Sequence, residues 1–212
     1  MAAAQADAAA GAGAPPLAPL ERARAFVALL RCGGNYDEPV LEGLEVAEAS
    51  AGRVLCRMRA ARKHANRYGT MHGGCIATLV DVIGSAAIIT QADRGGVSLS
   101  ITTHYLRPMA IGEVVEIEAT VAKIGKQIGT AVVSLRDAAS GALVAQGTHV
   151  KALVPHSDSG PALRAMAGEM RREEQQQQQQ QEQPGTRLGP PGGGGAARPP
   201  PVPPLVQPRS RL

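Results

Sequence analysis

The sequence predicts an α+β fold in which one long helix packs against an antiparallel sheet. Residues 75–90 form an almost unbroken apolar run, and its bulky side chains recur at three- and four-residue steps, which is typical of a helix. Segments in which apolar and polar residues alternate lie before and after this run, as expected of strands with one buried face. A long apolar helix with such strands is expected to form one helical layer and one sheet layer.

Three elements are predicted on the N-terminal side of the long helix. An amphipathic helix covers residues 20–31 and ends at Cys32 and the glycines that follow it. Two strands come next, over residues 40–48 and 53–61, with Gly52 in the turn between them. These elements precede a polar, glycine-containing loop that leads into the long helix.

The long helix has a predicted start and stop. Thr70 is the candidate cap at its beginning, and Gly95 and Gly96 end it, since paired glycines readily take positive φ. The strands predicted after it cover residues 97–105, 113–124, 128–136 and 143–153. Their hairpin spacing favours an antiparallel sheet.

The two ends of the chain differ in composition from its middle. Residues 1–19 are rich in Ala, Gly and Pro and are predicted to form a disordered leader. Residues 155–212 carry a glutamine run, a glycine run and many prolines, which predicts a disordered, low-complexity C-terminal tail with a short helix over residues 161–172. The folded domain is therefore expected to span residues 20–154.

The bulk composition excludes several classes of function. The net charge of +4 and the 2% aromatic content are unlike those of a nucleic-acid-binding protein. The longest apolar run is short for a membrane span and contains Asp81. The three cysteines are odd in number and lack metal-site spacing, which indicates reduced thiols. We expect a cytoplasmic protein without a metal, with the Ala-rich leader leaving the mitochondrion or another organelle open.

One carboxylate, Asp81, lies in the middle of the apolar helix. An ionised carboxylate among apolar side chains is costly unless a buried Arg or N–H groups pair with it, and chains often keep one for chemistry. Gly73 and Gly74 open the same helix, where free N–H groups favour a polarised carbonyl oxygen. Asp81 follows Gly74 by about two turns and so shares its face.

Asn66 and His72 lie just upstream of the two glycines. A histidine before a helix is often a cap or a packing residue, and an asparagine often makes a turn. Together with the helix amides and Asp81, however, they predict a site that polarises a carbonyl group and activates water.

The segment over residues 66–81 resembles the signature of hotdog-fold acyl-CoA thioesterases, including the phenylacetate-pathway group. It has the pattern Asn-x-x-Gly-Thr-x-His-Gly-Gly-x-x-Ala-Thr-Leu-x-Asp, and the resemblance extends over about residues 20–154. It implies a hotdog fold, in which an antiparallel sheet wraps the long central helix. It also implies hydrolysis of acyl-CoA thioesters in fatty acyl-CoA metabolism, with coenzyme A as part of the substrate and no separate cofactor.

The resemblance assigns the chemistry to a few residues. Asp81 is the general base on water or a nucleophile that forms an anhydride, and apolar neighbours make a carboxylate a stronger base. The amides of Gly73 and Gly74 polarise the thioester carbonyl. Asn66 orients water or the thioester, and His72 fixes the loop or aids the amides that bind the oxyanion.

The same resemblance places the site between the subunits of a homo-oligomer, a dimer or a dimer of dimers. Asn66 and the His72–Gly73 element come from one subunit, and Asp81 comes from the other. Ser98, just after the paired glycines, matches a hydroxyl residue that joins Asp81. Residues that match coenzyme A contacts are Gly74, Tyr105, Arg107, Pro108, Lys123, Gly125 and Lys126, with Arg62 and Lys151 as weaker candidates.

Two other functions fit parts of the pattern. An acyl-thioester dehydratase of this fold would pair a loop histidine with a helix acid, as His72 and Asp81 could. A non-catalytic acyl-CoA-binding protein would keep the pocket without turnover. The His-Gly-Gly context favours hydrolysis over the first, and the complete set of polar residues argues against the second.

Overall fold

The structure is a computed structural model, and it describes residues 16–32, 34–92, 94–154 and 160–182. The predicted order of helix, strands, long helix and four strands is present. The elements are α1 (Pro19–Arg31), α2 (Glu38–Leu41), β1 (Glu45–Ser50), β2 (Arg53–Arg59), a 3-10 helix (Arg62–His64), α3 (Gly73–Gln91), β3 (Gly96–Tyr105), β4 (Val114–Ile124), β5 (Ile128–Asp137), β6 (Leu143–Leu153) and α4 (Gly160–Glu182). Most of the predicted leader, residues 1–15, and the last part of the predicted tail, residues 183–212, lie outside the described residues.

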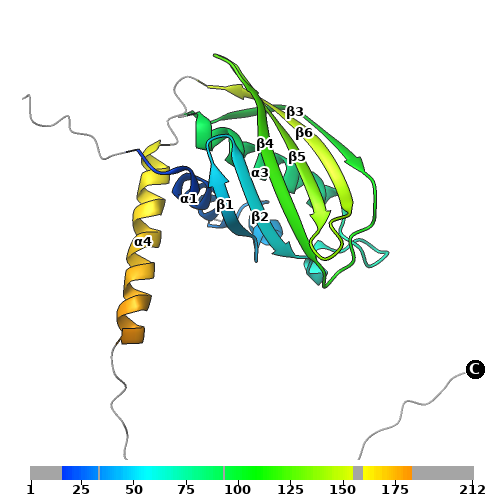
Figure 1. Ribbon diagram of the computed structural model, residues 1–212, viewed down its shortest axis with the longest axis horizontal. Helices are drawn as coiled ribbons and strands as arrows, with labels where there is room; N and C mark the ends of the chain where they lie inside the picture. The colour runs from blue at the N-terminus through cyan, green and yellow to red at the C-terminus, as the bar shows by residue number, and fades with distance from the viewer. Residues whose placement is uncertain (1–15, 33, 93, 155–159, 183–212) are drawn as a thin grey trace, which may run out of the picture.

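One antiparallel sheet curves around the long helix α3 (Figure 1). Its strand order is β1-β2-β4-β5-β6-β3, so β1 and β3 are the two edge strands. Every neighbouring pair is antiparallel. This is the predicted hotdog arrangement, with the central helix enclosed by the concave face of the sheet.

Helix α3 supplies much of the hydrophobic core. Leu79, Val80 and Ile83 are fully buried against the sheet. A Cβ at Gly147 of β6 would lie 2.7 Å from Val80, so glycine at this position lets helix and strand approach closely. By length and apolar composition alone, α3 could cross a membrane. Most of it is buried inside the protein, however, as in many core helices.

The strand predicted over residues 40–48 is wrong in its first half. Residues Glu38–Leu41 form the short helix α2, and β1 begins only at Glu45. Pro39 occupies the first turn of α2, where its missing N–H costs nothing. The Asn35 side chain accepts hydrogen bonds from the N–H groups of Asp37 and Glu38, which closes the turn into the helix.

The paired glycines after α3 have a different role from the predicted one. Neither Gly95 nor Gly96 is among the described glycines with positive φ. Gly96 is instead the first residue of β3, and a Cβ there would lie 2.0 Å from the carbonyl oxygen of Ala152 in β6. Glycine is therefore needed for close strand pairing rather than for a turn.

Helix α4 is longer than the helix predicted within the tail. It continues past residue 172 through the glutamine run to Glu182, because glutamine, glutamate and arginine are all good helix formers. Leu163 and Ala167 anchor its first half on Ala25 and Ile89. Its second half points away from the sheet (Figure 1), and residues 171–180 are exposed.

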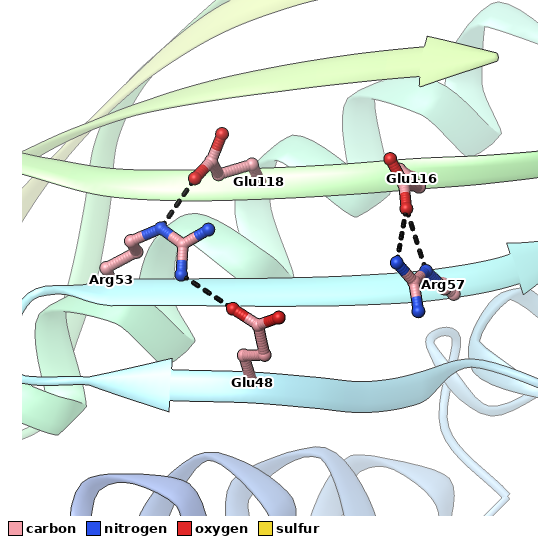
Figure 2. Close-up of polar contacts among 5 residues, drawn as sticks. All are labelled: Glu48, Arg53, Arg57, Glu116 and Glu118. Carbon is pink, nitrogen blue, oxygen red and sulfur yellow. Dashed lines mark hydrogen bonds and ion pairs between the residues drawn. The ribbon is translucent and has the colours of Figure 1, made fainter. Parts of the chain in front are cut away.

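The two ends of the sheet carry different side chains. Figure 2 shows a ladder of ion pairs across β1, β2 and β4. Arg53 pairs with Glu48 at 3.0 Å and with Glu118 at 2.6 Å, and Arg57 pairs with Glu116 at 2.7 Å. The other edge strand, β3, instead exposes large apolar side chains, namely Val97, Leu99, Ile101 and Tyr105.

Candidate active site

His72, and not Thr70, caps helix α3. Its Nδ1 accepts a hydrogen bond from the Gly74 N–H at 2.9 Å, and its own N–H donates to the carbonyl oxygen of His64 at 2.7 Å. The capping alternative for His72 is thus the one present in this structure. Because the Gly74 amide is engaged, Gly73 offers the more accessible of the two predicted donors at the helix mouth.

Asn66 shapes the loop that leads to this mouth. Its Oδ1 accepts from the N–H groups of Tyr68 and Thr70, at 2.9 and 3.2 Å, and its Nδ2 donates to Thr70 Oγ1 at 2.9 Å. Gly69 takes a φ of +77° within the same turn. The Asn66 side chain is therefore held by its own loop, while it also lines a hollow at the helix mouth.

Strand β3 ends over the helix mouth. The Tyr105 hydroxyl donates to the carbonyl oxygen of Gly73 at 3.1 Å, and the tyrosine ring lies against that glycine. The hollow beside it has a volume of about 320 Å³. It brings together five of the predicted site residues, namely Asn66, Gly73, Tyr105, Arg107 and Pro108.

Asp81 lies further along α3 and faces the β3 edge of the molecule. Its side chain is 40% exposed, so it is less enclosed by apolar neighbours than the sequence predicts. The Ser98 hydroxyl donates to Asp81 Oδ1 at 3.2 Å. His149 Nε2 lies 2.9 Å from Ser98 Oγ and 3.4 Å from Asp81 Oδ1. The structure thus joins the predicted pair Asp81 and Ser98, and adds a histidine.

Two hollows open on either side of Asp81. One, of about 400 Å³, is also lined by Tyr36, Gly74, Ala77, Thr78, Ile101, Thr103 and Tyr105. The other, of about 380 Å³, is also lined by Phe26, Leu30, Asp37, Val82, Ser85, Gly96, Val97, Ser98 and Lys151. Burial, with a contribution from the charge of Asp81, raises the pKa of the Asp37 carboxyl. Asp81 is therefore the carboxylate shared by both spaces.

Sequence reasoning overlooked His149 and misplaced Lys151. Both lie on β6, two residues apart, and so point to the same inward face. Burial lowers the pKa of the His149 imidazole and that of the Lys151 amine. Lys151 Nζ donates to Ser85 Oγ at 2.7 Å, inside the protein, which leaves it poorly placed for a coenzyme A phosphate. The sequence signal that could have identified them is the presence of two basic residues on the buried face of one strand, where basic residues are rare.

The helix mouth and Asp81 are far apart within one chain. Eight residues separate Gly73 from Asp81, which is about 12 Å along a helix at 1.5 Å per residue. A carbonyl group bound at the Gly73 amide is therefore out of reach of a water held by Asp81 in the same chain. Gly74, which shares the face of Asp81 as predicted, lines one hollow with it, whereas Gly73 lines the separate hollow at the helix mouth.

The predicted coenzyme A contacts also fall into separate groups. Tyr105, Arg107 and Pro108 lie at the helix mouth. Lys123 and Lys126 flank the β4–β5 turn, beside the start of β3, where Arg94 donates to the Lys126 carbonyl oxygen at 3.0 Å. Gly125 and Arg62 lie in neither group as free contacts. The Gly125 amide donates within the turn to Ile128 at 2.8 Å, and Arg62 starts the 3-10 helix before α3.

Comparisons by family model, by sequence and by structure all find thioesterases. The model of the thioesterase superfamily matches residues 68–143. Human acyl-coenzyme A thioesterase 13 is 40% identical over 117 residues, which are 55% of this chain and 84% of that protein. The solved structure of zebrafish thioesterase superfamily member 2 is 37% identical with a TM-score of 0.61, over 65% of this chain and 99% of that one.

The mouse structure of thioesterase superfamily member 2 is similar as well. It is 34% identical with a TM-score of 0.57, over 62% of this chain and 97% of that chain. These matches confirm both the hotdog fold and the resemblance found in the sequence. The chain therefore belongs to the thioesterase superfamily, in the group of hotdog enzymes that contains acyl-coenzyme A thioesterase 13.

Proposed function

We propose that this protein hydrolyses acyl-CoA thioesters to a free acid and coenzyme A. The observation that carries the proposal is the Asp81 carboxylate, which opens to two hollows and is oriented by Ser98 at 3.2 Å. The name of the human relative, which is 40% identical, supports the same substrate class.

In the proposed reaction Asp81 accepts a proton from water, and the resulting hydroxide attacks the thioester carbonyl carbon. The Gly73 amide, at the positive end of α3, donates to the carbonyl oxygen as it becomes negatively charged. The carbon–sulfur bond then breaks, coenzyme A leaves as its thiolate, and the proton on Asp81 neutralises the leaving group. An attack by Asp81 itself, through an anhydride, is the alternative course.

The 12 Å separation of mouth and carboxylate supports a site shared by two subunits. Strand β3 exposes Val97 and Leu99 by 61% and 57%, which is typical of a surface covered by a partner. If two β3 strands pair antiparallel about a two-fold axis, the end of one strand, at Tyr105, lies beside the start of the other, at Ser98. That pairing carries the helix mouth of one subunit towards Asp81 of the other.

The same pairing explains the divided coenzyme A contacts. Lys123 and Lys126 of one subunit approach the helix mouth of its partner, where Arg107 lies. Lysine and arginine side chains together would bind the phosphates of coenzyme A. A dehydratase is less well supported, because His72 Nδ1 is tied to Gly74 rather than facing Asp81.

The direct test is a panel of acyl-CoAs of different chain length and shape, with thiol release followed by a colorimetric trap. Wild-type protein should hydrolyse at least one member, and Asp81→Asn should bind it without turning it over. Tight binding with no thiol release by the wild type would instead support the non-catalytic acyl-CoA-binding function.

A further inference from the structure

A buried histidine stands behind the Asp81–Ser98 pair. His149 is fully buried, and its Nε2 lies 2.9 Å from Ser98 Oγ. Within the described residues its Nδ1 is buried and has no hydrogen-bond partner. Gly84 of α3 faces this nitrogen, and a Cβ there would lie 3.1 Å from it. The close approach of a glycine therefore seats the imidazole between β6 and α3.

The hydrogen bonds determine which nitrogen carries the proton. Ser98 has one hydroxyl hydrogen and donates it to Asp81 Oδ1. Its oxygen can then only accept from His149, so Nε2 must be the protonated nitrogen. The unpartnered Nδ1 is a bare lone pair in this tautomer.

Burial favours the neutral form of the imidazole. Burial lowers the pKa of His149, the nearby Lys151 ammonium acts in the same direction, and Asp81 opposes them. Protonation would also place a second N–H at Nδ1, in the tight space beside Gly84. The three side chains therefore form a series of two hydrogen bonds, in which His149 donates to Ser98 and Ser98 donates to Asp81.

We propose that His149 is a positioning residue for hydrolysis, and that its Nε2–H orients the Ser98 hydroxyl onto Asp81 Oδ1. This leaves the second oxygen of Asp81 to hold and activate water. The inference rests on the proposed function. No proton leaves His149 during the reaction, so it acts through Ser98 and touches neither water nor substrate.

The first test is a set of kinetic variants of the full chain. His149→Leu removes the donor and should lower kcat about ten- to a hundred-fold, the range for losing one hydrogen bond in a charged network, with little change in KM. His149→Gln can still donate from its side-chain amide and should keep most of the activity. A purely structural role would not distinguish Gln from Leu in kcat while leaving KM alone.

The second test asks whether His149 acts through Ser98. In a Ser98→Ala background, His149→Leu should have almost no further effect, because the hydroxyl that it orients is absent. Independent, multiplying losses would overturn the inference. Ile88→Val, a buried change on the same helix outside the series, is the folding control and should keep wild-type kcat.

The third test reads the histidine without activity. Nitrogen-15 chemical shifts of the His149 ring should show a neutral, Nε2-protonated imidazole at pH 6.5, and an Nδ1-protonated ring or an imidazolium there would overturn the inference. A wild-type protein inactive on every acyl-CoA would overturn the proposed function and this inference with it. An active wild type whose His149→Leu variant keeps full kcat overturns this inference alone.

Discussion

The two edges of the sheet are built in opposite ways. At the β1 edge, Arg53 and Arg57 pair with glutamates across three strands (Figure 2), and helix α1 packs beside β1. At the β3 edge, Val97 and Leu99 are exposed. Charged side chains protect an edge strand from pairing, whereas an apolar edge invites it. The difference indicates that β3 is the edge that meets a partner, and the reactive carboxylate lies next to it.

The largest expected effect compares one carboxylate at each edge. Asp81→Asn should lower kcat by about 10³-fold or more, within the range for losing a general base, while acyl-CoA still binds. Glu116→Gln removes a carboxylate from the ladder in Figure 2 and should leave kcat unchanged. Steady-state kinetics and equilibrium binding measure both. Wild-type turnover by the Asp81 variant would remove this residue from the reaction.

The second prediction compares one new lysine at each edge. Leu99→Lys places a charge on the apolar strand and should give a monomer in sedimentation, with activity reduced more than about tenfold because each site loses half its residues. Ser50→Lys adds the same charge at the end of β1 and should change neither property. An active Leu99→Lys monomer would show that β3 is not the subunit interface.

A smaller effect is expected at the turn that ends near β3. Lys126→Ala should raise KM for an acyl-CoA by about three- to tenfold, because it removes one cation from a phosphate group. It should leave a short thioester without the nucleotide unaffected. Arg136→Ala, on β5 near the Asp137–Gly141 turn, is the matched control. Equal effects of Lys126→Ala on both substrates would place it outside the coenzyme A site.

The smallest effect concerns acid stability behind the β3 edge. The pKa of His149 is lowered by burial, so as pH falls below about 6.5 the unfolded chain takes up a proton that the folded chain does not. The free energy of unfolding therefore keeps its full value above that pH and decreases below it. Denaturant unfolding should show a shallower loss between pH 7 and pH 5 for His149→Gln. An unchanged slope would mean that other groups, such as buried His64, dominate.

Much of the fold was predictable because the spacing of apolar residues along the sequence indicates which face of a helix or strand is buried. The bounds of β6 match the prediction, and those of α3 and β3 differ by a few residues. Local chemistry was harder: Pro39 and Asn35 turn an apparent strand into α2. In α4, the glutamine run indicated low complexity, although glutamine favours helix once Leu163 and Ala167 anchor the first half.

The site was half predictable. Asp81 and Ser98 lie together as the resemblance implied, since a polar residue in an apolar helix needs a polar partner. His149 was overlooked because β6 was interpreted only as a strand, without asking which face each residue occupies. Helical spacing alone predicts that Gly74 and Asp81 share a face about two turns apart. The assignment of Gly73 and Asp81 to different subunits came from the family resemblance, because no spacing within one chain indicates a partner.

Mixing two inactive variants tests the shared site most directly. Asn66→Ala damages the helix mouth, and Asp81→Asn damages the carboxylate, so each homodimer should be nearly inactive. A mixed dimer has one site with both changes and one with neither. Refolding or co-expressing the two in equal amounts should therefore restore about a quarter of wild-type specific activity, since half the dimers are mixed and each has one intact site. Activity no greater than the average of the two separate variants would contradict a site built from both subunits.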